Sequence, residues 1–335
     1  MNKKIKILTL ALVAALFASA FAASKKSIVC ITYPEYDWVM NILGDKASNF
    51  DVTLLQNNGT DLHSYQPSIK DMAKISVCDM LIFVGGESDE WVEKAVSEAK
   101  NKKMVVFNMM EALGDKVKEE EVVEGMQAED EDEEHEHEHH HEHADHEHEH
   151  HHHHDEIEYD EHVWLSLRNA AALVDGIAQK ICALDSSASA SYKANAATYI
   201  KALNDLDAQY KKTVAAAGKK TILFGDRFPF RYLADDYGLK YYAAFVGCSA
   251  ETEASFETVV FLAKKVDALG LPAVLTIEKS DKKIAKTIVS NTKAKNQAVL
   301  EMDSLQSVTQ KDIKGGRSYI NAMKNNLEVL KKALK

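Results

Sequence analysis

Short apolar segments alternate with helical segments in two separate stretches of this 335-residue chain. In the first stretch, strands are predicted at 27–33, 52–55, 79–84 and 104–108, with helices at 35–43, 68–77 and 90–100. In the second, strands are predicted at 220–224, 239–245, 273–277 and 297–300, with helices at 230–237, 254–269, 282–292 and 319–334. Because strands joined by crossover helices run parallel, each stretch predicts a short parallel sheet flanked by helices. The expected fold is therefore α/β, with two similar lobes.

A long segment without glycine or proline separates these two stretches. Between 191 and 217, Tyr192, Tyr199, Leu203 and Tyr210 recur at helical spacing, which predicts a helix of about 27 residues and about 40 Å. The expected organisation is an amino-terminal lobe at 24–187, a rigid interlobe helix at 188–217 and a carboxy-terminal lobe at 218–335. In such folds a ligand binds between the lobes, at the carboxyl ends of the strands.

The first residues have the pattern of a secretory signal peptide. Lysines within the first six residues precede an apolar run from 7 to 17, and alternating alanines follow from 18 to 22. We expect a signal peptide at 1–23 that is cleaved near 20–23. The mature protein is then expected in the periplasm, or secreted across the cytoplasmic membrane.

An acidic and histidine-rich segment lies at 119–157, within the predicted amino-terminal lobe. A segment this polar has little to bury, so we expect a disordered loop. Imidazoles beside carboxylates bind borderline divalent metals, so the run is predicted to be an auxiliary metal collector. Its histidines are His135, His137, His139, His140, His141, His143, His146, His148, His150, His151, His152, His153 and His154. The basic residues elsewhere are scattered, and no nucleic-acid partner is expected.

Two histidines lie outside that run, and each is in a predicted loop. His63 follows the strand at 52–55, and His162 precedes the helix that begins near 167. Carboxylates follow three strands of the second lobe, at Asp226, Glu278 and Asp303. A single such carboxylate is more often a helix cap or a surface charge. Together with two histidines, however, the set predicts a site for Zn²⁺ or Mn²⁺ between the lobes.

The remaining motifs are uninformative about catalysis. No nucleophile elbow, phosphate-binding loop or H-E-x-x-H sequence is present, so we expect no enzymatic activity. Cys30, Cys78, Cys182 and Cys248 are widely spaced and form no C-x-x-C motif. Each is expected to be a buried free thiol, although export permits a disulfide whose pairing the sequence does not define.

Several short motifs resemble those of the solute-binding proteins of zinc and manganese ABC importers. They are DLHSYQPS at 61–68, DEHVWLS at 160–166, YGL at 237–239, ETEAS at 251–255 and Y-x-x-x-M-x-x-N at 319–326. The resemblance covers essentially the whole mature chain. It implies two α/β lobes joined by a rigid helix, a metal in the cleft and a membrane permease as partner. The histidine-rich insertion is typical of zinc-selective members, so Zn²⁺ is the expected ion. We expect the protein to be a monomer.

The resemblance also implies a set of ligands. The family's histidine ligands fall on His63 and His162, and its acidic ligand falls on Asp303. The family's third ligand, His or Glu, falls on Arg227, whose guanidinium donates hydrogen bonds only and cannot bind a metal. Asp226, one residue away, could substitute for it if the loop turns. Otherwise water, Glu278 or a histidine of the 135–154 run would complete the site. The alternatives are a Mn²⁺ or Fe²⁺ binding protein of the same type, or a surface-displayed metal buffer or adhesin.

Overall fold

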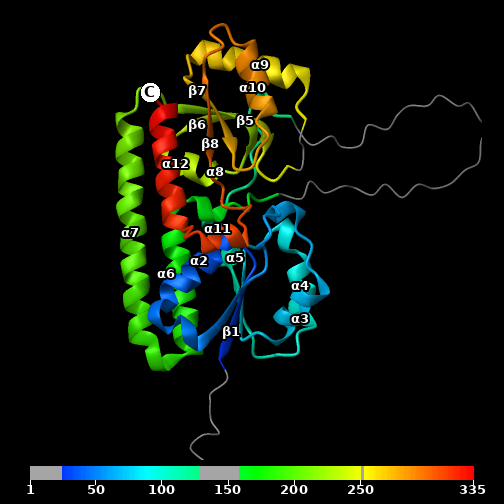
Figure 1. Cartoon of the computed structure of the whole chain (residues 1–335), viewed down its shortest axis with the longest axis vertical. Helices are drawn as coiled ribbons and strands as arrows, with labels where there is room; N and C mark the ends of the chain where they lie inside the picture. Colours follow the sequence, from blue (N-terminus) through cyan, green and yellow to red (C-terminus); the bar gives the residue numbers. More distant parts are fainter. Residues whose placement is uncertain (1–24, 128–157, 250–252) are drawn as a thin grey trace, which may run out of the picture.

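The computed structural model describes residues 25–127, 158–249 and 253–335, which form two four-stranded parallel sheets (Figure 1). The first has the order β2-β1-β3-β4, with β2 Phe50–Leu54, β1 Lys26–Cys30, β3 Met80–Phe83 and β4 Val105–Asn108. The second has the order β6-β5-β7-β8, with β6 Lys240–Val246, β5 Thr221–Phe228, β7 Ala273–Ile277 and β8 Ala298–Met302. Every pairing is parallel, so the predicted α/β fold with two parallel sheets is confirmed.

Eleven helices accompany the sheets in the described part of the chain. They are α2 Tyr33–Leu43, α3 Ile69–Val77, α4 Trp91–Ser97, α5 Met109–Leu113, α6 Leu167–Leu184, α7 Ser189–Ala216, α8 Arg231–Tyr237, α9 Phe256–Leu269, α10 Lys283–Asn291, α11 Gln310–Lys314 and α12 Tyr319–Ala333. The sequence did not predict α5 and α11, because five residues are too few to show a helical period. The predicted signal peptide at 1–23 and the histidines at 135–154 lie outside the described residues.

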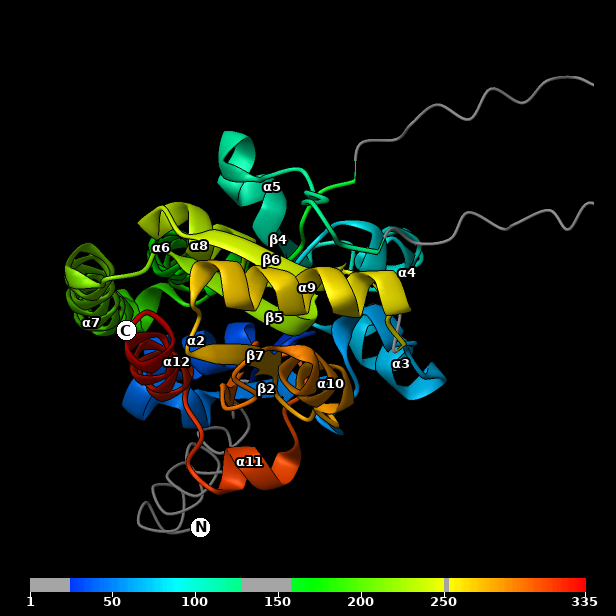
Figure 2. The ribbon, with the colours of Figure 1, turned by 90° about the horizontal axis from the view of Figure 1, so that it is seen from above.

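Each sheet has an outer helical layer with its own hydrophobic cluster. On the first sheet, α3 and α4 cover side chains such as Val29 and Leu81. On the second sheet, α9 and α10 cover side chains such as Leu223 and Val274. Figure 2 shows α9 lying across β5 and β6, beside α10. The outer layers therefore belong to separate lobes.

The inner layer is shared by the two lobes. One hydrophobic cluster contains Ile28 and Ile82 of the first sheet together with Ile222 and Leu275 of the second. The helices α2, α6, α7 and α12 contribute to the same cluster and pack against one another. The lobes are consequently joined by a continuous core as well as by the chain.

The helix α7 provides the long connection that the sequence predicts. It has 28 residues and runs along both lobes, beside α6 and α12 (Figure 1). One stripe of its side chains is buried along the whole length, from Tyr192 through Leu203 to Val214. Within the described ranges, no helix combines the length and apolarity needed to cross a bilayer.

The carboxyl ends of the two sheets face the same interlobe region. Contacts between the lobes gather there: the indole N–H of Trp164 donates to the carbonyl of Ser304 at 2.9 Å. Asn58, just after β2, forms an isolated bridge with Thr309, which lies after β8. The loops at these strand ends carry the candidate ligands.

Candidate metal centre

His63 is placed by the turn that follows β2. It lies in a single 3₁₀ turn, Leu62–Ser64, which Asp61 caps by accepting the backbone N–H of His63 at 3.1 Å. Its Nδ1 lies 2.9 Å from the hydroxyl of Ser88 and 3.5 Å from a carboxylate oxygen of Glu161. These partners orient the ring so that Nε2 points away from them, toward His162.

His162 is fully buried at the start of the 3₁₀ turn Val163–Leu165. Asp160 accepts both the backbone N–H of His162, at 2.8 Å, and its ring Nδ1, at 3.0 Å. A proton on Nδ1 leaves the lone pair of Nε2 free, the tautomer that a metal ligand requires. Gly247 packs directly on the ring, because an added Cβ there would lie 3.2 Å from two ring atoms.

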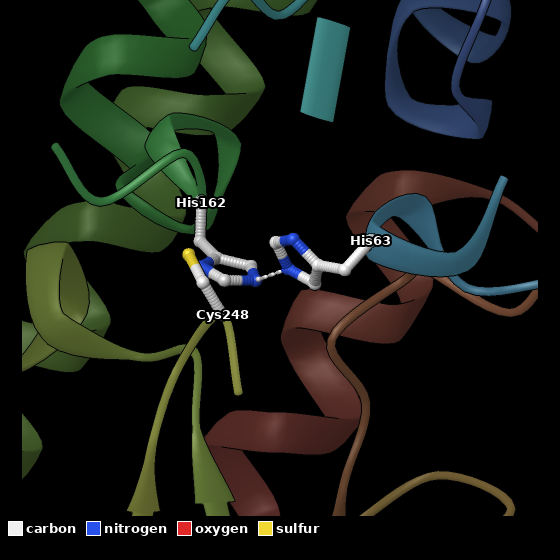
Figure 3. Close-up of side chains that lie close together, drawn as sticks. All are labelled: His63, His162 and Cys248. Carbon is white, nitrogen blue, oxygen red and sulfur yellow. Dashed lines mark hydrogen bonds between the residues drawn. The ribbon is translucent and has the colours of Figure 1, made fainter. Parts of the chain in front are cut away.

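The two imidazoles meet at their Nε2 atoms, which lie 3.1 Å apart, with ring centroids separated by 5.1 Å (Figure 3). The sulfur of Cys248 lies beside the ring of His162 (Figure 3). One ligand atom from each of His63, His162 and Cys248 lies within 4.8 Å of the others. Among the His, Cys, Asp and Glu residues of the described ranges, no other group of three or more meets this criterion.

Burial and charge act differently on the two histidines. Burial, reinforced by the neighbouring charge of His162, lowers the pKa of His63 to about 3, so His63 is neutral at physiological pH. Burial also disfavours charge on His162, but the carboxylates of Asp160, Glu161 and Asp61 outweigh it and raise its pKa. The neutral His63 therefore has a nitrogen available to bind a metal at physiological pH. At His162, a metal must compete with a proton.

Cys248 is the ligand candidate that the sequence analysis did not single out. It follows β6 after Gly247, and Glu120 accepts its backbone N–H at 3.1 Å. Burial raises the pKa of its thiol, and the charges of Asp160 and Glu120 add to the effect. Like Asp226, Glu278 and Asp303, Cys248 follows a strand of the second lobe. The same criterion, applied to cysteines, would have predicted it as a ligand. All four cysteines are free.

Arg227 lies beside the centre, but its guanidinium has no lone pair available to bind a metal. Its guanidinium forms an ion pair with Asp61 and donates to the carbonyl of Ser249 at 3.2 Å. It therefore links the turn that carries His63 to the loop that carries Cys248. A fixed positive charge next to a cation site must be offset by nearby carboxylates or by an anionic ligand.

The predicted carboxylates lie outside the three-residue cluster. Asp226 and Glu278 line a neighbouring pocket of about 410 Å³ that also reaches Asp61, Arg227 and Ser249. Glu278 accepts backbone N–H groups of Ser304, Gln306 and Ser307, so it organises the loop after β8.

Asp303 forms an ion pair with Arg317 and accepts the backbone N–H of Leu305 at 2.9 Å. Its carboxylate is thus engaged by its own loop and by the residue just before α12. The part of Asp226, Glu278 and Asp303 as metal ligands stays a prediction.

Gln306 is a further residue at the centre that sequence reasoning missed. Its side-chain NH₂ donates to Asp61 at 3.0 and 3.1 Å. Its oxygen lies 3.0 Å from Nε2 of His162 and accepts from it when both ring nitrogens of His162 are protonated. The sequence does not indicate that Gln306 reaches the centre, because the position of its amide depends on the hydrogen bonds by which Glu278 orders that loop.

The fold and the site define a two-lobed α/β binding protein with nitrogen and sulfur donors at one buried point between the lobes. The chain belongs to the family described as zinc-uptake complex component A, periplasmic (ZnuA), whose profile matches residues 28–333. This family agrees with the resemblance that the sequence motifs indicate.

Individual relatives extend over nearly the whole chain. The zinc-binding protein AdcA of Streptococcus pyogenes is 30% identical over 342 residues, 99% of this chain and 61% of the relative. The high-affinity zinc uptake system protein ZnuA of Bacillus subtilis is 29% identical over 92% of this chain and 88% of its own length. The Zn(II)-bound ZnuA-like domain of Streptococcus pneumoniae AdcA superposes with a TM-score of 0.68 at 28% identity, covering 92% of this chain and 99% of that domain. The chain spans only about three fifths of the length of the AdcA relatives.

Proposed function

We propose that this protein captures Zn²⁺ outside the cytoplasmic membrane and delivers it to the membrane permease of an ABC importer. It acts as a monomeric binding protein, and the ion is its cargo. Family membership supports this class of function, and the zinc named for the relatives supports the choice of cargo. His63 and His162 are the ligands on which the proposal depends.

The observation that carries the proposal is the 3.1 Å separation of the two Nε2 atoms. With zinc–nitrogen bonds of about 2.0–2.1 Å, two nitrogens of a tetrahedral site lie about 3.3 Å apart. The pair is thus almost at ligand spacing, and its burial limits competition from water. Because α7 runs unbroken along both lobes, binding and release are expected to move local loops more than whole lobes.

The histidine run is proposed to supply ions to this centre. Its flanking segments are fixed close by: Glu119 bridges to Tyr159, near His162, and Gln127 bridges to Phe245, near Cys248. Weak ligands attached beside a tight site raise the local metal concentration there. Deletion of 129–156 should leave one tight zinc site, remove the weak ones and slow uptake under zinc scarcity. Loss of the tight site on deletion would contradict this part.

Calorimetric titration of the full mature chain with Zn²⁺ tests the main proposal. The double variant His63→Ala, His162→Ala should lose the tight site and keep the weaker binding of the histidine run. Tight binding that survives in the double variant contradicts the proposal. Elemental analysis of the purified protein separates zinc from the alternatives, because a manganese or iron protein would carry that metal instead.

A further inference from the structure

We propose that Cys248 binds the same metal ion as His63 and His162, as a thiolate, so that the centre has two nitrogen ligands and one sulfur ligand. The inference rests on the proposed function and deepens it, because it names the missing third ligand. It also specifies the cargo as a borderline or soft cation, Zn²⁺ rather than Mn²⁺, since thiolates select such metals.

The first argument is distance. The ligand atoms of the three residues lie within 4.8 Å of one another. In a tetrahedral zinc site, bonds of about 2.3 Å to sulfur and 2.0–2.1 Å to nitrogen place these atoms about 3.5 Å apart. The upper limit of these separations exceeds that spacing by about 1 Å, so the inference requires side-chain rotation to close the triad around an ion.

The second argument is that four of the neighbouring carboxylates are already engaged. Asp61 is paired with Arg227, Asp303 is paired with Arg317, and Asp160 accepts from His162 itself. Glu278 accepts several donors of the loop after β8. An ion held by Cys248 leaves all these contacts in place, whereas recruiting Asp61 or Asp303 breaks an ion pair.

The third argument is charge. Arg227, which occupies the sequence position expected for a ligand, brings a permanent positive charge beside the centre and is only 16% exposed. Asp61 offsets that charge in the ion pair, and two neutral imidazoles contribute no negative charge against a divalent ion. A thiolate adds one negative charge in direct contact with the metal, where it is most effective.

The backbone also directs Cys248 toward this point. The residue directly follows Gly247, which packs on the ring of His162, and its own N–H is fixed by Glu120. The adjoining carbonyl of Ser249 accepts from Arg227. Hydrogen bonds thus hold the backbone at Cys248 and at Ser249. Rotation of the Cys248 side chain is then the main movement that can bring its sulfur toward an ion.

Cobalt substitution tests this inference on the full mature chain. Co²⁺ bound to a thiolate gives an intense sulfur-to-cobalt charge-transfer band in the near ultraviolet, and Co²⁺ bound to imidazoles alone does not. The run at 135–154 contains no cysteine, so it does not contribute to that band. Cys248→Ser should abolish the band and weaken zinc binding about 10- to 1,000-fold in competition with a chelator. It should also lower the preference for Zn²⁺ over Mn²⁺.

Cys182→Ser is the matched control, because Cys182 is also a free, partly buried thiol but contacts Ser189 on the distant α6–α7 connection. It should keep the band and the affinity. A wild-type protein that binds one Co²⁺ tightly without the band overturns the role of Cys248 and leaves the proposed function intact, as does a band that persists in Cys248→Ser. Absence of tight metal binding in the wild type overturns both.

Discussion

At the scale of single residues, the geometry of the centre depends on side chains that hold the candidate ligands in position. Asp160 fixes the tautomer of His162, Asp61 caps the turn of His63 and Glu120 fixes the backbone of Cys248. Such supporting contacts commonly change metal affinity 10- to 100-fold when removed. The smallest of these supports is Gly247, which has no side chain at all.

Gly247→Ala is expected to disturb the ring of His162. An added Cβ would lie 2.9 Å from the carbonyl of Phe228 and 3.2 Å from the ring, too close without a shift. We expect the unfolding free energy to fall by about 1–3 kcal/mol, and zinc affinity to fall at least about 10-fold. Urea unfolding and chelator competition measure the two effects.

Gly218→Ala is the control, because a Cβ added there has no other atom within 4 Å. This variant should change neither quantity appreciably. Equal behaviour of the two variants would contradict the close contact.

Asp89 makes stability depend on pH near neutrality. It is 2% exposed, its Oδ2 accepts the backbone N–H groups of Val84 and Gly85, and burial raises its pKa to about 7. The folded protein therefore binds an extra proton, so this contribution to stability is complete below about pH 4 and is lost as pH rises through about 7.

In urea unfolding of metal-free protein, the wild type should lose on the order of 1–3 kcal/mol between pH 5 and pH 8 through this group. Asp89→Asn, which has no proton to lose, should show a smaller loss between the two pH values. Asp115→Asn on the exposed surface should behave as the wild type does. A wild-type pH difference that Asp89→Asn leaves unchanged would assign the effect to other groups.

Among the helices and strands, α7 is the clearest case of packing that the sequence dictates. Its apolar residues face the shared core at regular spacing, and its other faces are polar and exposed. Leu203→Ala should reduce the unfolding free energy by about 2–5 kcal/mol, because the site lies in the centre of a close-packed layer. Lys211→Ala, at an exposed position of the same helix, should cost less than about 0.5 kcal/mol. Denaturant titration measures both, and a similar cost for the two would refute the packing assignment.

The sequence was informative about elements wherever burial imposes a pattern. All eight strands were predicted, since each is a short apolar run, and the helix expected to begin near 167 is α6, Leu167–Leu184. The strand β5 is longer than predicted, because an irregularity between Phe224 and Arg227 lets it continue past polar residues. That extension places Arg227 beside the centre.

The site was only partly predictable, because most of its contacts join residues that are far apart in the sequence. His63 and His162 stand out by residue type, whereas Cys248 and Gln306 reach the centre through loops whose course depends on Glu120 and Glu278. Contacts between residues so distant in the chain have no local signature. The conflict at Arg227, recognised from the motif alone, was the sequence's one indication that the ligand set is unusual.

The shared core makes the two lobes one cooperative unit. Side chains of both sheets join a single cluster through α2, α6, α7 and α12. Calorimetry of the metal-free protein should therefore give one unfolding transition, with equal calorimetric and van't Hoff enthalpies. Excess Zn²⁺ should raise its midpoint without dividing it. Two separated transitions would show that the lobes fold independently and that the common cluster adds little.

The repeated strand order has a consequence for how cargo leaves. β2 and β6 occupy matching places in the two sheets, so His63 and Cys248 follow counterpart strands and reach the proposed ion site from opposite lobes. In established metal sites, metal–ligand distances lie within about 0.2 Å of their usual values. In the proposed site, a local movement of either loop by about a bond length would detach the ligand on that side, so the ion could be released while α7 stays straight.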